Sequence, residues 1–227
     1  MADPAPLLTI RRDFPRPAPE QRAAFANVPT GWVVDANWRR GALHHSVRPL
    51  TRKTSFVGTA LTVWSRACDN LAPYAAIAFA RPGDVLVVAT DGYETAGVAG
   101  DILLGMAKNK GVVALVTDGM VRDLPGLDGV GIPVFARGLT PNSPQKDGPG
   151  EIGFAVAIGG VAVSAGDLVV GDQDGVVVVA RERIAAVAAG LGAVREKEAE
   201  MDAAVRAGAT QHDWLADVLA RRARYVA

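Results

Sequence analysis

The fold class is decided by three consecutive stretches: Val85-Leu-Val-Val-Ala89, the glycine-punctuated segment 97–110, and Val112-Val-Ala-Leu-Val116. The outer two are short, apolar and rich in β-branched residues, which is typical of buried strands. The middle segment is long enough for a helix, and Gly111 is a residue that often ends one. Strand, helix and strand in this order predict a β-α-β unit of an α/β protein.

The same alternation continues on both sides of this unit. On the N-terminal side, Val57-Gly-Thr-Ala-Leu-Thr-Val-Trp64 predicts a strand, because its residues alternate and many are β-branched. Asp69 is placed to cap a following helix, expected to run from Leu71 to Phe79. On the C-terminal side, Ile132-Pro-Val-Phe-Ala136 predicts a further buried strand.

Beyond a polar, proline-rich loop the pattern changes to short strands and then to helix. Strands are expected at residues 153–158, 161–163, 168–170 and 176–179, and helix from Arg181 onward. A β-α-β-α-β segment followed by meandering strands favours a compact arrangement of β/β/α layers over a doubly wound sheet.

The N-terminal region carries prolines at positions 4, 6, 15, 17 and 19, which predict an extended arm. Short helices are expected at Glu20–Ala26 and Gly31–Trp38, the second capped by Thr30. We therefore expect a single α/β domain, with an arm at 1–20, a core at 21–180 and a helical C-terminal segment at 181–227.

Composition limits the classes of function. The formal net charge of the 227 residues is +0, which gives no basic surface for nucleic acid. A single cysteine, Cys68, excludes an internal disulfide and fits a reducing cytoplasm. The N-terminus has the wrong charge for a signal peptide, and the most apolar stretch, 152–166, is too short and too glycine-rich to cross a bilayer. We expect a cytoplasmic protein that binds neither nucleic acid nor membrane.

One constellation of charges stands out: Asp101, then 20 intervening residues, then the adjacent pair Arg122-Asp123. Asp101 follows Gly100 at the start of the predicted helix, where backbone N–H groups favour an anion. Arg122 offers a planar fork for a carboxylate, and a single Asp is a typical sparse anchor for Mg²⁺. The alternative interpretation is structural: Asp101 and Asp123 each cap a helix, and Arg122 lies on the surface.

Other chemical motifs are weaker. His44-His45 has no third ligand at metal spacing, and its rings are expected to point apart. No serine lies in a nucleophile elbow, and no glycine-rich phosphate loop follows a strand. The lysines lie in polar contexts that would not lower a pKa, which argues against a Schiff-base mechanism.

Gly100-Asp101-Ile102-Leu103, with Arg122-Asp123 following, resembles the signature of the RraA-like family and of its class II pyruvate aldolases. The likeness extends to Phe56–Val63, to Arg81–Val87 and to the segment from Gly159 to Val177, and covers roughly residues 28 to 208. The resemblance implies a swivelling β/β/α fold, assembled as homotrimers or dimers of trimers with active sites between subunits.

The resemblance also implies a reaction. Members with the full motif are similar to 4-hydroxy-4-methyl-2-oxoglutarate aldolase, which releases two pyruvates, and they also tend to decarboxylate oxaloacetate. Both reactions pass through a pyruvate enolate that a divalent cation, Mg²⁺ or Mn²⁺, can stabilise. The partner expected is therefore a small 2-keto acid.

Roles follow by position in the motif. Asp123 would ligate the metal and Arg122 would bind the substrate. Gly100, Asp101, Ile102 and Leu103 would line the substrate pocket, with Asp101 orienting a metal-bound water that acts as base. The family also supplies an acidic residue from the C-terminal helix of a neighbouring subunit, and Glu198 is the match for it in this chain.

Three other functions compete with this one. The family is named after a protein that binds and inhibits a ribonuclease, but that type lacks the full acid-to-Arg-Asp signature. Methyl transfer is disfavoured because no glycine-rich nucleotide loop follows a strand. A phosphohistidine carrier would need an exposed histidine flanked by glycines on a loop, which His44-His45 does not provide.

Overall fold

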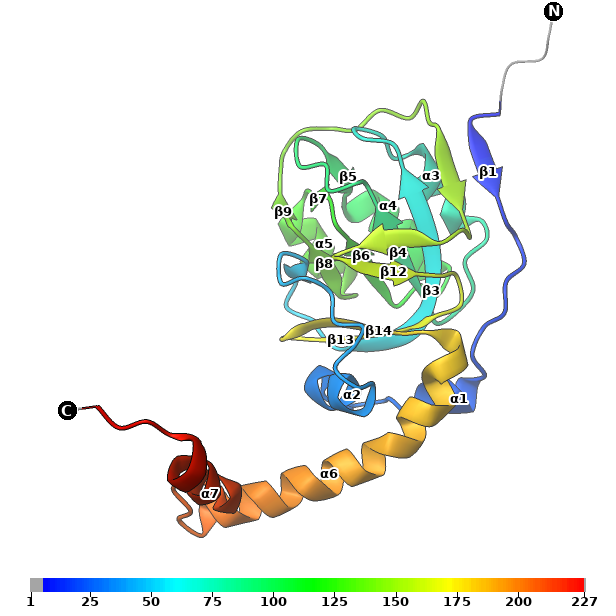
Figure 1. Ribbon diagram of the computed structural model, residues 1–227. Helices are drawn as coiled ribbons and strands as arrows, with labels where there is room; N and C mark the ends of the chain where they lie inside the picture. The colour runs from blue at the N-terminus through cyan, green and yellow to red at the C-terminus, as the bar shows by residue number, and fades with distance from the viewer. Residues whose placement is uncertain (1–5, 227) are drawn as a thin grey trace, which may run out of the picture.

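Strand β3 (Phe56–Ser65) organises a nine-stranded sheet that runs through the middle of the molecule (Figure 1). In the computed structural model, which describes residues 6–226, β3 pairs in parallel with β4 (Asp84–Ala89). It also pairs antiparallel with two later strands, β10 (Gly150–Ile152) and β13 (Leu168–Asp172). The other strands of this sheet are β1 (Leu8–Ile10), β2 (Arg48–Pro49), β6 (Ala114–Thr117), β8 (Val134–Ala136) and β14 (Gly175–Val179).

The central strand β4 is buried on both faces, as its sequence predicts. Val85 and Val87 enter one core, which includes β11 (Val156–Ile158) and β12 (Val161–Val163). Leu86 and Val88 enter another, which is covered by three helices. These are α3 (Leu71–Ile77), α4 (Asp101–Asn109) and α5 (Leu124–Val130). The two-residue period of a strand sorts the side chains in this way.

A third core lies between the β13–β14 hairpin and the helices below it in Figure 1. These helices are α1 (Pro19–Ala23), α2 (Thr30–Ala36) and α6 (Ile184–Arg206). Phe25 and Val33 pack there against Leu168 and Val170. Helices, two layers of strands and further helices thus follow one another, which confirms the expected α/β class with β/β/α layers.

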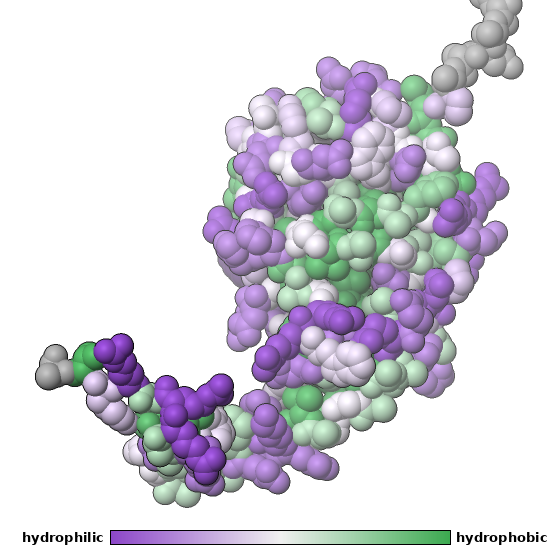
Figure 2. All heavy atoms as spheres, in the orientation of Figure 1, coloured by the Kyte–Doolittle hydropathy of each residue, from purple (hydrophilic) through white to green (hydrophobic). Residues whose placement is uncertain are grey.

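The helical C-terminal segment begins with a short 3-10 turn, Arg181–Arg183, and continues as α6 and α7 (Asp213–Arg222). The last buried residue of α6 is Leu191, and beyond it the helix leaves the body as an arm that carries α7 (Figures 1 and 2). Within residues 6–226, no helix combines the length and apolar character that crossing a membrane requires.

The segment 97–110 is only partly helical, which corrects the sequence prediction. Residues 97–99 form β5 (Gly97–Ala99), which pairs with β7 (Met120–Val121), and β7 pairs with β9 (Gly138–Leu139). The helix begins only at Asp101, because Gly100 is extended (φ −139°, ψ −172°). Gly111 follows the helix with φ +87°, as expected for a residue that ends one.

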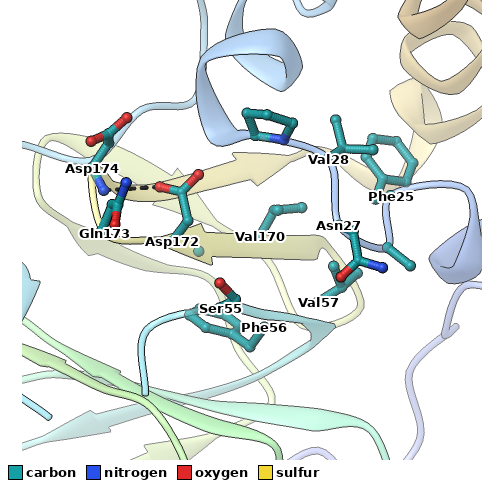
Figure 3. A pocket seen from close by; sticks show the side chains of 13 residues that line it. Phe25, Asn27, Val28, Ser55, Phe56, Val57, Val170, Asp172, Gln173 and Asp174 are labelled. Carbon is teal, nitrogen blue, oxygen red and sulfur yellow. Dashed lines mark hydrogen bonds between the residues drawn. The ribbon is translucent and has the colours of Figure 1, made fainter. Parts of the chain in front are cut away.

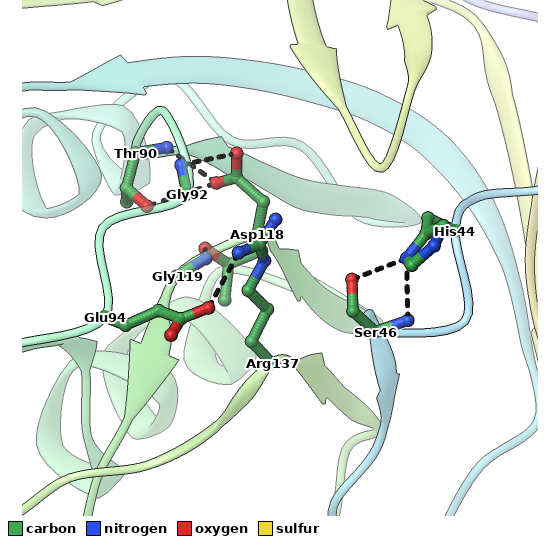
Figure 4. Close-up of polar contacts among 9 residues, drawn as sticks. His44, Ser46, Thr90, Gly92, Glu94, Asp118, Gly119 and Arg137 are labelled. Atoms are coloured by element: carbon green, nitrogen blue, oxygen red, sulfur yellow. Dashed lines mark hydrogen bonds and ion pairs between the residues drawn. The ribbon is translucent and has the colours of Figure 1, made fainter.

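The turn between β6 and β7 is fixed by Asp118 (Figure 4). Its carboxylate accepts hydrogen bonds from the backbone N–H groups of Thr90 at 2.7 Å and Gly92 at 3.0 Å. The neighbouring Arg137 forms an ion pair with Glu94 at 2.7 Å. The ends of β4 and β6 are therefore joined, and this holds β7 and the residues that follow it.

Other local predictions also need correction. Thr30 is the first residue of α2 rather than its cap, and its hydroxyl and N–H both donate to Asp172 at 2.8 Å. Helix α3 ends at Ile77, because Phe79 N–H already bonds to Ala76 in a tighter turn. The strand expected at 153–158 begins at 156, after a left-handed turn at Gly153 (φ +82°).

Candidate active site

The three charged residues of the sequence motif line one cavity of about 160 Å³. Asp101 comes from the first turn of α4, and Arg122 and Asp123 come from the turn between β7 and α5. The backbone of β5 and the loop 143–146 complete the lining together with α3. Elements that are distant in the sequence thus bring an acid, an arginine and a second acid to one place.

Asp101 is held in a defined orientation at the start of α4. Its Oδ1 accepts the backbone N–H of Ile102 at 2.7 Å, and its Oδ2 packs against Gly126 of α5, where a side chain would collide with it. The capping role considered from the sequence is not observed, because Gly100 is the cap residue and Asp101 is the first residue of α4. The carboxylate nevertheless remains partly exposed and lines the cavity.

The other residues of the Gly100–Leu103 segment contribute differently to the cavity. Gly100 precedes the helix and lies beside Asp123. The side chain of Ile102 is 64% exposed, whereas that of Leu103 is buried in the core between the sheet and the helices. All four line the cavity, and the Leu103 side chain also anchors α4 to the sheet.

Asp123 occupies the position before α5, but its carboxylate makes no capping bond. Its backbone is left-handed (φ 62°, ψ 45°), a conformation that is uncommon for a residue other than glycine. This turn brings Asp123 Oδ2 to 3.2 Å from Nε of Arg122, although adjacent residues do not face each other in a regular element. Asp123 therefore holds the cap position of α5, as the structural interpretation expects, and its carbonyl accepts the Leu127 N–H at 2.9 Å, but its carboxylate is free of that role.

Arg122 is held at both its backbone and its side chain. Its N–H donates to Ala99 of β5 at 3.0 Å, and its Nη1 donates to the hydroxyl of Ser143. The guanidinium group thus joins the β7–α5 turn to the loop 143–146, and 37% of the side chain remains exposed. It is oriented and still accessible to a ligand.

Sequence reasoning missed the four other residues with polar side chains that line the cavity: Asn70, Tyr74, Ser143 and Lys146. Asn70 and Tyr74 belong to the start of α3, and Ser143 and Lys146 to the proline-rich loop. Neither segment has a pattern that predicts a site. The nearest signal was Asp69, predicted as the cap of this helix; the cap residue is Asn70, although Asp69 Oδ1 does accept the Leu71 N–H at 2.9 Å.

The donors in the cavity fit a sparsely held cation and do not form a closed cage. Among the described residues, no group of three or more His, Cys, Asp or Glu is placed to hold a metal ion. The Asp123 side chain is 43% exposed, and the only polar contact of its carboxylate within residues 6–226 is the Arg122 pair on Oδ2. A carboxylate of this kind suits Mg²⁺, which keeps several waters and takes further ligands from the substrate.

The other residues considered from the sequence lie outside this cavity. Glu198 is on the exposed part of α6, outside the cavity that contains Asp101. His44 and His45 lie on a loop with ring centroids 4.1 Å apart, so the expectation that the rings point apart is wrong. His44 bonds to Ser46 (Figure 4), and Cys68 is half-buried in a turn.

A larger hollow of about 520 Å³ lies between the α1–α2 loop and strands β3 and β13 (Figure 3). Its lining is largely apolar, including Phe25, Val28 and Phe56. Its most prominent acid, Asp172, is already bonded to Thr30 and to the Asp174 N–H. The smaller cavity combines two acids with an arginine and a lysine, whereas the larger one has two acids and no basic side chain.

Comparison with known proteins agrees with this architecture. The profile of the RraA-like family, described as Aldolase/RraA, matches residues 30–178. A protein of Halalkalibacterium halodurans named "Putative 4-hydroxy-4-methyl-2-oxoglutarate aldolase" is 38% identical over 183 residues, which are 81% of this chain and 86% of that protein. The chain therefore belongs to the RraA-like family.

Solved structures share the fold. An uncharacterized protein from Pseudomonas syringae pv. tomato superposes with a TM-score of 0.75 at 25% identity, over 87% of this chain and 97% of the other. Streptomyces coelicolor RraAS2, described as an unusual member of the RNase ES inhibitor RraA protein family, gives a TM-score of 0.72 at 29% identity. That match covers 84% of this chain and all of the other (100%).

Proposed function

We propose that this protein is a divalent-metal-dependent aldolase that cleaves 4-hydroxy-2-keto acids such as 4-hydroxy-4-methyl-2-oxoglutarate to pyruvate. Oxaloacetate decarboxylation would be a side activity, since it passes through the same enolate. The observation that carries the proposal is the convergence of Asp101, Arg122 and Asp123 on one cavity. The similarity to the Halalkalibacterium halodurans protein supports it.

Each residue has a physical role in this reaction. Arg122, fixed by Ser143, presents its guanidinium group to the carboxylate or keto oxygen of the substrate. Asp101, oriented by the Ile102 N–H, assists removal of the proton from the 4-hydroxyl group before the C–C bond breaks. Asp123 would hold Mg²⁺ or Mn²⁺, which as a Lewis acid stabilises the negative charge that develops on the enolate.

The charges in the cavity agree with an anionic substrate. Arg122 and Lys146 are cationic, and Asp101 and Asp123 are anionic, so the formal charges of these four side chains cancel. A divalent cation on Asp123 would leave the site positive, and it would then attract a keto acid with one or two carboxylates.

The decisive test is pyruvate release from 4-hydroxy-4-methyl-2-oxoglutarate and from oxaloacetate, measured with Mg²⁺ and with EDTA. Wild-type protein should turn over in Mg²⁺, lose activity in EDTA and recover when metal is restored. Asp123→Ala should be inactive. Asp128→Ala is the matched control, because Asp128 lies on α5, the helix that Asp123 precedes, but pairs with Arg52 outside the cavity. Metal-independent turnover, or no turnover of either compound, would contradict the proposal.

A second candidate function is a non-catalytic regulator that binds and inhibits a ribonuclease. The description of the Streptomyces coelicolor relative favours it. A regulator should inhibit its ribonuclease equally with Mg²⁺-free and Mg²⁺-loaded protein, and Asp123→Ala should not affect the inhibition. Comparison of the Mg²⁺-free with the Mg²⁺-loaded protein therefore distinguishes the regulator from the aldolase.

A further inference from the structure

Residues 7–16, here called the strap, run along the outer edge of the large sheet as an extended chain (Figure 1). Within the strap, β1 pairs with one edge of β10, whose other edge pairs with β3. The carbonyl of Leu7 accepts the Gly150 N–H at 3.0 Å, and the Arg11 N–H donates to the carbonyl of Ile152 at 2.9 Å. The strap therefore closes an edge of β10 that would otherwise be open.

The body of the protein is shaped to receive the backbone of the strap. A Cβ atom on Gly153 would lie 2.4 Å from the carbonyl oxygen of Arg11, and one on Gly166 would lie 2.0 Å from that of Pro15. Side chains at these two positions would push the strap away from the sheet. The strap thus has a defined seat that continues beyond β1.

The side chains of the strap, in contrast, hold it only weakly. None of residues 7–16 is buried, and its apolar members Leu8, Ile10 and Phe14 pack against the core while remaining partly exposed. Segments with few buried side chains open locally without unfolding of the rest of a protein. The strap therefore has the character of a unit that can open separately.

Arg16 fastens the C-terminal end of the strap. Its Nε and Nη2 donate to the carboxylate of Asp84 at 3.0 and 2.9 Å, and its guanidinium carbon lies 3.9 Å from the centre of the Phe14 ring. Asp84 is 1% exposed, and Nη1 of Arg16 is buried without an acceptor among the described residues. A buried ion pair adds little net stability, because the attraction is offset by the lost hydration. This contact is therefore specific in geometry and still able to open.

The strap is in contact with the loop 143–149, which contributes to the candidate active site. A Cβ atom on Gly148 would lie 3.0 Å from the carbonyl oxygen of Leu7, the same oxygen that bonds to the first residue of β10. At the other end of the loop, the Ser143 hydroxyl accepts a hydrogen bond from Arg122. The strap, the loop and the arginine of the site are thus joined in series.

We propose that the strap is a releasable device that orders the loop 143–149, with Arg16 as the positioning residue that keeps it closed. The closed strap holds the loop, and Ser143 then holds Arg122. An open strap leaves the sheet folded and the loop loose. The consequence for activity rests on the proposed aldolase function, whereas the consequence for loop order does not.

Arg16→Gln tests the device, because glutamine is polar but cannot form the two-pronged pair with Asp84. Amide hydrogen exchange of the full-length protein, followed by mass spectrometry, should become about tenfold or more faster in residues 7–16 and 145–150. Exchange in β4, β6 and α4 should be unchanged. Arg16→Lys, which keeps the charge beside Asp84, should restore part of the protection. Arg12→Gln is the matched control and should have no effect, because Arg12 is an exposed arginine of the same strap that lies 5.7 Å from the Phe79 ring.

Arg11→Pro opens the strap without leaving Asp84 unpaired. It removes the N–H that bonds to Ile152, and it should speed exchange in the same two segments. Wild-type exchange of the loop in both variants, even with a faster strap, would overturn the proposal. Faster exchange throughout the sheet in both variants would also overturn it, because the strap would then be part of the global fold.

Pyruvate release links the strap to catalysis. Arg16→Gln and Arg11→Pro should each lower kcat/KM about tenfold, more through KM than through kcat, because Arg122 loses its orientation for the substrate. Arg16→Lys should recover part of this loss. Unchanged kcat/KM with a faster-exchanging loop would overturn the consequence for activity. If the wild-type protein cleaves no keto acid, the aldolase proposal fails, and the exchange measurement still decides whether the strap orders the loop.

Discussion

Gly100 and Asp123 are in direct contact across the cavity: a Cβ atom at position 100 would lie 2.5 Å from Oδ2 of Asp123. The same atom would lie 3.3 Å from Cγ of Arg122. The backbone of Gly100 is in the extended region that any residue adopts, so the absence of a side chain is required by space and not by conformation. Gly100 thus gives the Asp123 carboxylate its position.

We predict that Gly100→Ala reduces metal-dependent activity by about tenfold or more, because the new methyl group displaces the Asp123 carboxylate. The concentration of Mg²⁺ that gives half-maximal activity should rise as well. Pyruvate release over a Mg²⁺ titration measures both effects, and circular dichroism checks that the fold is retained.

Gly105→Ala is the matched control on the same helix. Nothing lies within 4 Å of the position of its Cβ, and the residue is in the interior of α4. This variant should keep full activity and gain roughly 0.5 to 1 kcal/mol in the free energy of unfolding, because alanine favours helix more than glycine does. Equal activity in the two alanine variants would refute the role given to Gly100.

Arg122→Lys should lower kcat/KM about 10- to 100-fold although the charge is kept. Lysine cannot donate to Ser143 and to a substrate oxygen through one planar group, as the guanidinium of Arg122 can. Arg52→Lys is a suitable control, because Arg52 is 92% exposed and pairs with Asp128 at 3.6 Å on the surface. Full activity of Arg122→Lys would show that only the charge is needed.

Sequence reasoning found the parts of this site that depend on local pattern. The run Val85–Ala89 predicts a strand buried on both faces, and its alternate side chains do enter two different cores. Asp101, Arg122 and Asp123 stand at the predicted ends of elements, but the pattern alone leaves a structural interpretation open, and their roles follow from the resemblance to the RraA-like family. The strand prediction needs only the neighbours along the chain, whereas the site prediction also needs the family signature.

The parts that were missed depend on long-range contacts. Asn70 and Lys146 reach one cavity because Asp69 bonds to Asp147 and Gly148, and no local pattern encodes that pairing. Residues 97–99 precede the helix without an obvious break in the sequence, but pairing with β7 makes them a strand. The contact between Arg122 and Asp123 depends on the left-handed backbone of Asp123, which spacing alone does not reveal.

Glu198 gives a prediction about assembly. It lies on the part of α6 that leaves the body, so a role in catalysis would require the cavity of another subunit (Figure 1). If trimers form with shared sites, Glu198→Ala and Asp123→Ala should each be nearly inactive. Mixed oligomers prepared from both should recover about a quarter of the wild-type activity, as random pairing of the two halves implies. Inactive mixed oligomers would argue against a shared site.

Asp167 gives a prediction about pH. It is 5% exposed, and this burial raises the pKa of its carboxyl above the ordinary value of 3.8, although the N–H groups of Ser164 and Arg181 donate to it at 2.8 and 3.0 Å. The folded state therefore binds this proton more tightly than the unfolded state does. The resulting contribution to stability is complete below the unfolded pKa and is lost as pH rises through the folded pKa.

Urea unfolding of the wild type and of Asp167→Asn between about pH 4 and 7 isolates the effect of this residue, since the other groups titrate alike in the two proteins. The free energy of unfolding of the wild type should fall relative to that of the variant as pH rises. A difference that is constant over this range would show that burial does not govern the titration of Asp167.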